Sequence, residues 1–177
     1  MKLLALLLFL FCLHANAGIY IEPYAGYVSQ KYDIKGSGTL SGTPFTIDDT
    51  DSDSGVGFGG KLGYSIPLLA IGADYMQAGD VSDLGPFLEV RLPLFLKFRT
   101  TYIMASKTKT DDDEFKFKGT GFKAGLAFSL FLNLTLNVDY ISVKYDKLDG
   151  NISGYDFDSI DVKRNAYMVS LGFPFDI

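Results

Sequence analysis

Alternation between apolar and polar residues is the feature of this sequence that most constrains its fold. From residue 132 to residue 140 every second residue is apolar, and every residue between them is polar. Successive side chains of a β-strand point to opposite faces, so this segment predicts a strand with one apolar and one polar face. The pattern recurs along most of the chain with no helical stretch between the repeats. The sequence therefore predicts an all-β fold.

The N-terminus carries the features of a secretory signal peptide. Lys2 precedes an apolar run over residues 3–13, which is too short to cross a bilayer as a helix. Residues 15–17, Ala-Asn-Ala, form a cleavage motif with small residues at both ends. Residues 1–17 are therefore expected to be removed on export, and residues 18–177 to form a single domain.

Composition excludes several kinds of chemistry. The only cysteine and the only histidine, Cys12 and His14, both lie in the predicted signal, so no disulfide or thiol chemistry is expected of the mature domain. Loss of Lys2 with the signal changes the formal net charge from −5 to −6. This acidic balance gives no support for nucleic-acid binding. No apolar run after the signal reaches the roughly 20 residues of a membrane-spanning helix.

Eight strands and two kinds of connection are predicted. The strands cover residues 19–29, 55–66, 69–77, 86–92, 94–106, 119–130, 132–144 and 165–175. The tight connections lie near Pro67, Pro93 and Phe131. The longer connections cover residues 35–54, 78–85, 107–118 and 146–162. Short turns at one end and long loops at the other are typical of outer-membrane barrels. We therefore predict an eight-stranded antiparallel up-and-down transmembrane β-barrel in the cell outer membrane.

Alternation also assigns each side chain to a face. The apolar face carries no charge, as a lipid-facing surface requires, because Arg or Lys at mid-depth costs about 2 to 4 kcal/mol. The charged residues on the other face are expected to form a lumen network: Glu22, Lys61, Asp74, Glu89, Arg91, Lys97, Arg99, Lys123 and Asp139. An unpaired buried charge is very costly, so these acids and bases are expected to pair and to plug the narrow lumen. An ion or proton path is the alternative.

Aromatic residues recur at the ends of the apolar band. Tyr75, Tyr102 and Tyr140 each lie eight or nine residues beyond a tight connection. Eight residues of a tilted strand climb roughly 20 Å, close to the height of the apolar band. Tyrosine favours strands in general, but the repeated spacing favours an aromatic girdle. The predicted girdle comprises Tyr27, Tyr64, Tyr75, Tyr102, Phe128, Tyr140 and Phe173.

The signal, the opening Gly-Ile-Tyr-Ile-Glu-Pro-Tyr-Ala-Gly-Tyr of residues 18–27 and the glycine-rich hairpins resemble a known family. This is the small outer-membrane β-barrel domain family of Gram-negative bacteria, with its OmpA-like and OmpX-like eight-stranded barrels. The resemblance covers the whole mature chain and is one of pattern, not of a sharp motif. It implies an integral outer-membrane protein with its long loops outside the cell. Family members often end on an aromatic residue that the assembly machinery reads. Here Asp176 and Ile177 follow Phe175.

Catalysis is not expected, and neither is a cofactor. The resemblance extends to lipid A deacylases and palmitoyltransferases, but such acyl chemistry needs a base, usually histidine, and the predicted mature chain has none. Asp49, Asp51 and Asp53 have a spacing that could ligate Ca²⁺, which makes them a weak metal candidate. An EF-hand would need glycine at Ser54 and glutamate at Gly60, so the motif fails.

The expected partners follow from the membrane fold. They are outer-membrane lipid and lipopolysaccharide, the outer-membrane assembly machinery, and an unidentified extracellular partner at the long loops of a monomer. Two alternatives remain open. One is an OmpW-like conduit for small apolar compounds, which would need an apolar lumen. The other is a secreted soluble lipocalin-like barrel that binds a small apolar ligand, which would need the apolar face inside.

Overall fold

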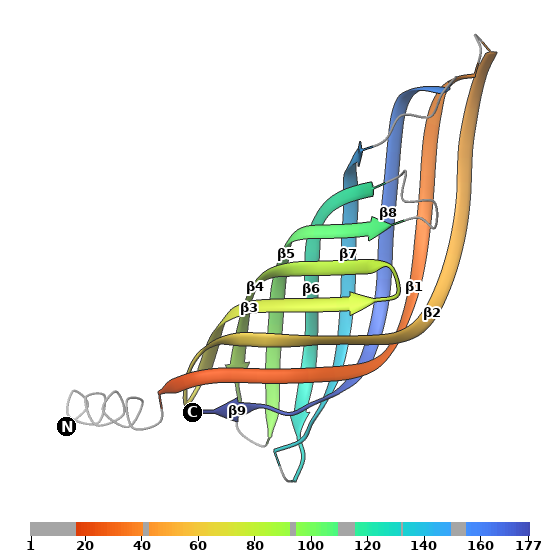
Figure 1. The fold of residues 1–177 in the computed structure, drawn as a ribbon. Coiled ribbons are helices and arrows are strands. Elements are labelled where there is room, and N and C mark those ends of the chain that lie inside the picture. The colour runs from red at the N-terminus through yellow and green to blue at the C-terminus, as the bar shows by residue number, and fades with distance from the viewer. Residues whose placement is uncertain (1–16, 41–42, 93–94, 110–115, 132, 150–154) are drawn as a thin grey trace, which may run out of the picture.

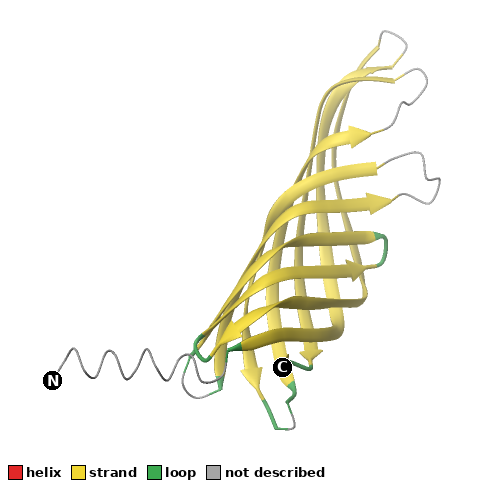
Figure 2. Cartoon of the chain, turned by 60° about the vertical axis from the view of Figure 1, so that its left-hand side comes forward, coloured by secondary structure: helices red, strands yellow, loops and turns green. Residues whose placement is uncertain are grey.

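The computed structural model describes residues 17–40, 43–92, 95–109, 116–131, 133–149 and 155–177. The predicted signal therefore lies almost entirely outside the described residues. Eight long strands and one very short strand make up the fold (Figures 1 and 2). They are β1 (Gly18–Leu40), β2 (Thr43–Ile66), β3 (Leu69–Ala78), β4 (Val81–Arg91), β5 (Leu96–Lys109), β6 (Lys116–Ser129), β7 (Thr135–Asp149), β8 (Tyr155–Gly172) and β9 (Phe175–Asp176). Within the described ranges, no helix is long and apolar enough to cross a membrane.

The strands close into a barrel. Each of β1 to β7 pairs antiparallel with the next strand in sequence, and β8 pairs with β1 from Gly172 opposite Tyr24 to Tyr155 opposite Leu40. The short β9 follows an interruption at Pro174 and pairs with the start of β1. A closed ring leaves no free sheet edge at this level of the fold. The predicted eight-stranded antiparallel up-and-down barrel is confirmed.

The long connections are shorter than predicted, because the strands continue into them. β1 reaches Leu40 and β2 starts at Thr43, so most of the predicted loop 35–54 is a hairpin. The predicted loop 78–85 is a turn at Gly79 and Asp80, with Gly79 at φ 55°. A glycine at the first central position suits a two-residue hairpin turn. Polar strand ends are held by backbone hydrogen bonds and need no apolar alternation, which explains why the pattern missed them.

The extended strands build a wall above the ring. β2 pairs with β3 only from Gly57 to Ile66, whereas its partner β1 continues to Leu40 beside it. The part of β2 from residue 43 to residue 56 therefore has a neighbouring strand on one side only. Figures 1 and 2 show β1, β2 and β8 rising well above the short β3–β4 hairpin.

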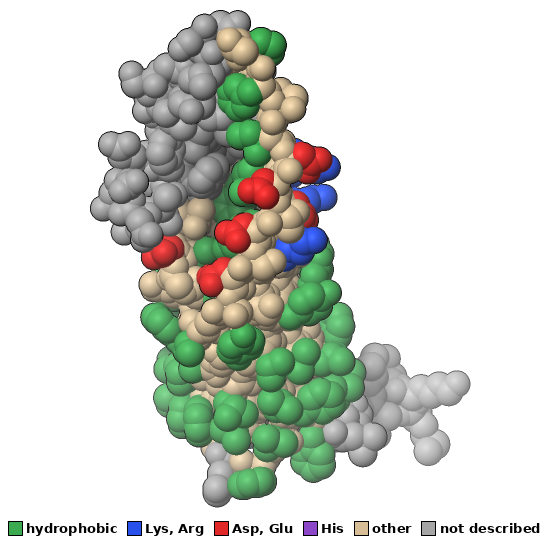
Figure 3. All heavy atoms as spheres, turned by 90° about the vertical axis from the view of Figure 1, so that its right-hand side faces the viewer, with side chains coloured by type: hydrophobic (Ala, Val, Ile, Leu, Met, Phe, Trp, Pro, Cys, Tyr) green, Lys and Arg blue, Asp and Glu red, His purple; other side chains and the backbone are tan. Residues whose placement is uncertain are grey.

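The outer surface of the ring is apolar. Exposed side chains along alternate strand positions include Phe58, Leu62, Ile71, Val138 and Val169. On the face drawn in Figure 3, hydrophobic side chains gather over the lower part of the molecule, with acidic and basic side chains above them. Leu94 and Leu132, which alternation places on the apolar face of their predicted strands, lie outside the described part of the chain. The soluble lipocalin-like alternative requires this face inside, so the structure contradicts it.

Candidate functional site

The lower half of the barrel lumen holds a network of ion pairs. All nine charged residues predicted to face the lumen lie there, and eight of them have at most 9% of their surface exposed. Arg91, at the lower rim, is only partly buried, with 18% of its side chain exposed. Each of the nine takes part in at least one ion pair with another member of the set.

Glu22 on β1 is the centre of this network. Lys61 Nζ, on the neighbouring strand β2, donates to Glu22 Oε2 at 2.8 Å, and both side chains are almost completely buried. The hydroxyl of Tyr20 also donates to Oε2. Oε1 accepts from Thr135 at 3.2 Å and lies 3.5 Å from the guanidinium of Arg99. One carboxylate thus connects strands from opposite sides of the ring.

Two further carboxylates have their own basic partners. Arg99 binds Asp139 through both ends of its guanidinium, with Nε donating to Oδ1 at 2.8 Å and Nη2 to Oδ2. Asp74 pairs with Lys123 and accepts from the Tyr24 hydroxyl at 2.8 Å. Bidentate and hydroxyl-supported contacts of this kind are the stronger class of hydrogen bond, and they satisfy charges that water cannot reach.

The lower rim is closed by contacts to the chain end. Glu89 lies 3.4 Å from Arg91 and 3.8 Å from Lys97. Arg91 also donates to both carboxylate oxygens of Asp176 at 3.2 Å, and Ser65 donates to the same carboxylate at 2.5 Å. Asp176 thus ties β9 to β2 and β4.

A second buried ion pair lies higher in the lumen and was not predicted. Arg164 on β8 is fully buried and pairs with Asp83 on β4, which also accepts from Ser106 at 2.6 Å. Tyr32 on β1 lies opposite Arg164, above the membrane band. Burial raises the pKa of Tyr32 to about 12, and the positive charge of Arg164 opposes this shift. Arg164 and Met168 both face inward on β8. The predicted strand began at residue 165, so a start one residue earlier would have placed Arg164 in the lumen.

Apolar side chains fill the lumen between and around these ion pairs. The inward face of the upper barrel carries a buried cluster that includes Val28, Met76, Ile103, Ile141 and Met168. Charged side chains therefore fill the lower half of the lumen, whereas apolar side chains surround the Arg164–Asp83 pair in the upper half. In these segments the residues on both faces are apolar, so alternation alone could not reveal the change in character.

The residues of the predicted girdle all lie on the outer surface. Tyr27, Tyr64, Tyr75, Tyr102, Phe128 and Phe173 are exposed, and Tyr140 is partly covered. Tyr140 packs against Tyr167 at 5.3 Å and against Phe122 at 6.0 Å between ring centroids. The rings of Tyr140, Tyr167 and Phe122 lie together on the outer wall, an arrangement that suits the boundary between lipid and water.

The three aspartates of the weak metal candidate lie on the one-sided part of β2. Their carboxylates accept from the backbone N–H of the following residue, with Thr50, Ser52 and Ser54 as donors at 2.7 to 2.8 Å. These N–H groups belong to alternate residues, so they point to one side of the strand, where no neighbouring strand pairs with them. Among the described residues, no group of three acidic, histidine or cysteine side chains is placed to hold a metal ion.

Comparison with solved structures identifies proteins of similar fold. No family model matches the sequence, and a search of curated proteins gives no match. Among solved structures, the chain is similar to Neisserial surface protein A (NspA), with a TM-score of 0.52 and 15% identity over 90% of this chain and 99% of that one. It is also similar to Ail, the attachment invasion locus protein of Yersinia pestis, in complex with the heparin analogue sucrose octasulfate. The TM-score is 0.50, with 12% identity over 89% of this chain and 99% of Ail. These likenesses support the fold of a small outer-membrane β-barrel.

Proposed function

We propose that this protein is exported by its N-terminal signal and resides in the bacterial outer membrane as a monomeric barrel with a closed lumen. The observation that carries the proposal is the distribution of charge. The ring exposes apolar side chains such as Leu62 and Val138, while its acids and bases are paired inside. A water-soluble barrel would bury the first set and expose the second. Only a closed barrel or a helix can satisfy its backbone within lipid.

The filling of the lumen supports the proposal that it is closed. The paired charges block the lower half, and the side chains of the apolar cluster are almost fully buried in the upper half. A hollow that reaches this layer beside Met76 and Ile103 has a volume of about 10 Å³. This is about the smallest space that holds a single water molecule. The filling argues against an ion path and against a conduit for apolar compounds, although the upper lumen has the apolar character that such a conduit needs.

The wall formed by β1, β2 and β8 is the part that would meet partners outside the cell. It carries acidic and basic side chains on exposed polar strands (Figure 3). We propose a non-catalytic role in surface interaction or in the structure of the envelope. The fold likeness to a surface protein and to an attachment protein is consistent with this role.

Fractionation of cells that express the full chain tests the proposal. The protein is expected in the outer-membrane fraction, to lack residues 1–17, and to migrate faster on a gel when it is not boiled. Recovery in the soluble periplasm without a heat-dependent shift would refute the membrane placement.

A further inference from the structure

Polar side chains from five strands meet around a hollow at the lower mouth of the barrel. The hollow has a volume of about 200 Å³ and lies at the end where β9 pairs with β1, opposite the wall of extended strands (Figure 1). We call it the mouth pocket. Its polar lining comprises Arg91 on β4, Lys97 on β5, Ser129 on β6, Asn133, Thr135 on β7 and Asp176 on β9.

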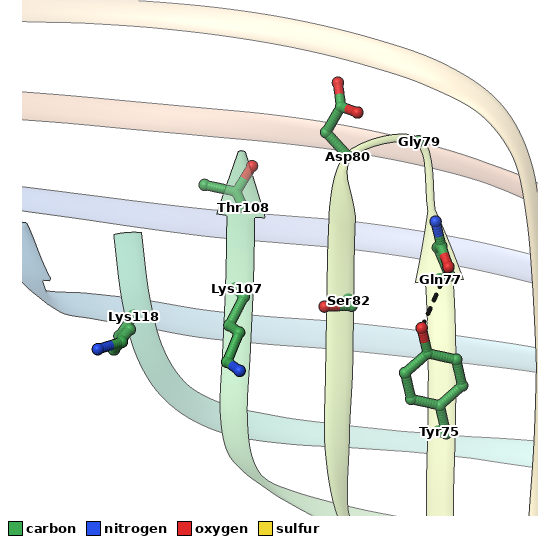
Figure 4. A pocket seen from close by; sticks show the side chains of 8 residues that line it. All are labelled: Tyr75, Gln77, Gly79, Asp80, Ser82, Lys107, Thr108 and Lys118. Atoms are coloured by element: carbon green, nitrogen blue, oxygen red, sulfur yellow. Dashed lines mark hydrogen bonds between the residues drawn. The ribbon is translucent and has the colours of Figure 1, made fainter. Parts of the chain in front are cut away.

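A larger hollow lies on the outer face over β3 to β6, with a volume of about 470 Å³ (Figure 4). The side chains around it do not converge. Tyr75 donates to Gln77 of its own strand at 3.1 Å, Lys107 and Lys118 point in different directions, and the carboxylate of Asp80 points away from both lysines. The mouth pocket differs because its lining comes from strands that close around one opening.

Lys97 is a cation of the mouth pocket that lacks a hydrogen bond. Only 9% of its surface is exposed, and its ammonium lies 3.8 Å from Glu89 Oε1, beyond hydrogen-bond distance. It donates no hydrogen bond to any other residue in the described ranges. Lys61, by contrast, donates to Glu22 at 2.8 Å. The three N–H donors of the Lys97 ammonium are therefore available to a ligand.

Asp176 supplies an acceptor in the same pocket. Its side chain is 43% exposed, and its carboxylate accepts two hydrogen bonds from Arg91 at 3.2 Å and one from Ser65 at 2.5 Å. A carboxylate has about four acceptor positions, so Asp176 can accept a further hydrogen bond. The side chains of Ser129 and Asn133 have no hydrogen-bond partner within the described part of the chain, so they too can serve a ligand.

The charges around the mouth pocket balance. Arg91 and Lys97 are matched by Asp176 and by Glu89, which lies 3.4 Å from Arg91. A ligand with a single charge would leave one charge uncompensated, whereas a zwitterion keeps the site neutral. Pockets for drug-sized ligands start at about 300 Å³, so the smaller mouth pocket suits a group about the size of one amino acid.

We propose that the mouth pocket binds the zwitterionic group of an amino acid, with an ammonium and a carboxylate on one carbon. The ammonium of Lys97 binds the ligand's carboxylate, with Ser129 and Asn133 beside it. The carboxylate of Asp176 accepts from the ligand's ammonium. This inference rests on the proposed outer-membrane placement, which turns the lower mouth toward the periplasm. The group is carried there by free amino acids and by the peptides of the cell wall.

The test is titration of the refolded, full-length barrel with alanine in non-ionic detergent micelles, followed by NMR of the backbone amides. Propionate and ethylamine each lack one charged group of alanine and are expected to bind about tenfold more weakly. Lys97→Met removes the charged donor and is expected to weaken alanine binding about tenfold, or about 1.4 kcal/mol. The matched control is Lys107→Met, which removes an exposed lysine of the same strand outside the mouth pocket and should bind alanine as the wild type does.

A second variant tests the acceptor. Asp176→Asn is expected to weaken the binding of alanine and not that of propionate, because only alanine carries an ammonium. Equal weakening of both ligands would overturn the role of Asp176 in binding the ligand.

The heat-dependent gel shift separates this inference from the proposed function. Loss of the shift in the wild-type protein would refute the barrel itself. With the shift retained in every variant, equal alanine binding by wild type and Lys97→Met, or no binding by the wild type, would overturn the site. Equal binding of propionate and alanine would overturn the zwitterion as its ligand. A soluble cell-wall tetrapeptide that binds more tightly than alanine would assign the site to the cell wall, and weaker binding would assign it to free amino acids.

Discussion

Replacement of Glu22 by leucine tests the lumen network at its centre. The change removes the carboxylate that accepts the hydrogen bond of the Lys61 ammonium. The side chain of Lys61 is fully buried, with 0% of its surface exposed. Lys61 would keep the faces of Tyr24 and Phe87, at 5.6 and 5.8 Å from the ring centroids, and the more distant negative charges of Asp74 and Glu89. Arg99 would keep its bidentate partner Asp139. The main consequence is therefore one buried cation without its hydrogen-bonded carboxylate.

Removal of one partner from a buried ion pair costs about 3 to 5 kcal/mol, so the free energy of unfolding of Glu22→Leu should fall by that amount. Urea titration of the barrel in detergent micelles, followed by circular dichroism, measures it. Adding Lys61→Met to Glu22→Leu removes both charges, and the double variant should recover to within about 1.5 kcal/mol of the wild type. A single variant that is as stable as the wild type would refute the reasoning, because Lys61 would then have found water inside the barrel.

Two other predictions concern the outer surface and the edge of β2. Leu62→Arg places a cation in the middle of the apolar belt and should lower the free energy of unfolding in lipid by about 2 to 4 kcal/mol. Thr50→Arg, above the belt, should change this free energy by less than about 1 kcal/mol. Urea unfolding in liposomes compares the two variants. Replacement of Asp49, Asp51 and Asp53 by alanine frees three edge N–H groups and should increase edge-to-edge association, seen as dimers by size-exclusion chromatography. Replacement of the same three aspartates by asparagine removes the same charge but keeps a side-chain oxygen as acceptor, so it should leave the protein monomeric. Equal dimer formation in this control would show that loss of charge, not free N–H groups, is the cause.

The alternation of apolar and polar residues predicts the barrel well because a lipid-facing surface requires apolar side chains at every second strand position. Within the apolar belt, a charge on the outer face is costly, so residues such as Leu62 and Val138 mark their strands clearly. Above the belt both faces of a strand meet water, and the sequence from Asp48 to Ser54 resembles a polar loop although it pairs with β1 throughout. The strand ends there are fixed by backbone pairing that composition does not encode.

The candidate site could be predicted only in part, for a similar reason. Inward placement of Glu22 or Lys61 follows from counting along one strand. The partnership of Arg164 with Asp83 depends on the register and closure of the whole ring, because these residues lie on β8 and β4.

The most direct test of the account is the electrical conductance of the refolded barrel in planar lipid bilayers, with insertion verified by the heat-dependent gel shift. The paired charges and the packed upper layer predict no stable conductance steps above the bare bilayer at physiological salt. Reproducible, long-lived steps from the inserted wild-type protein would contradict this prediction. They would mean that the charged residues line an open path through the membrane.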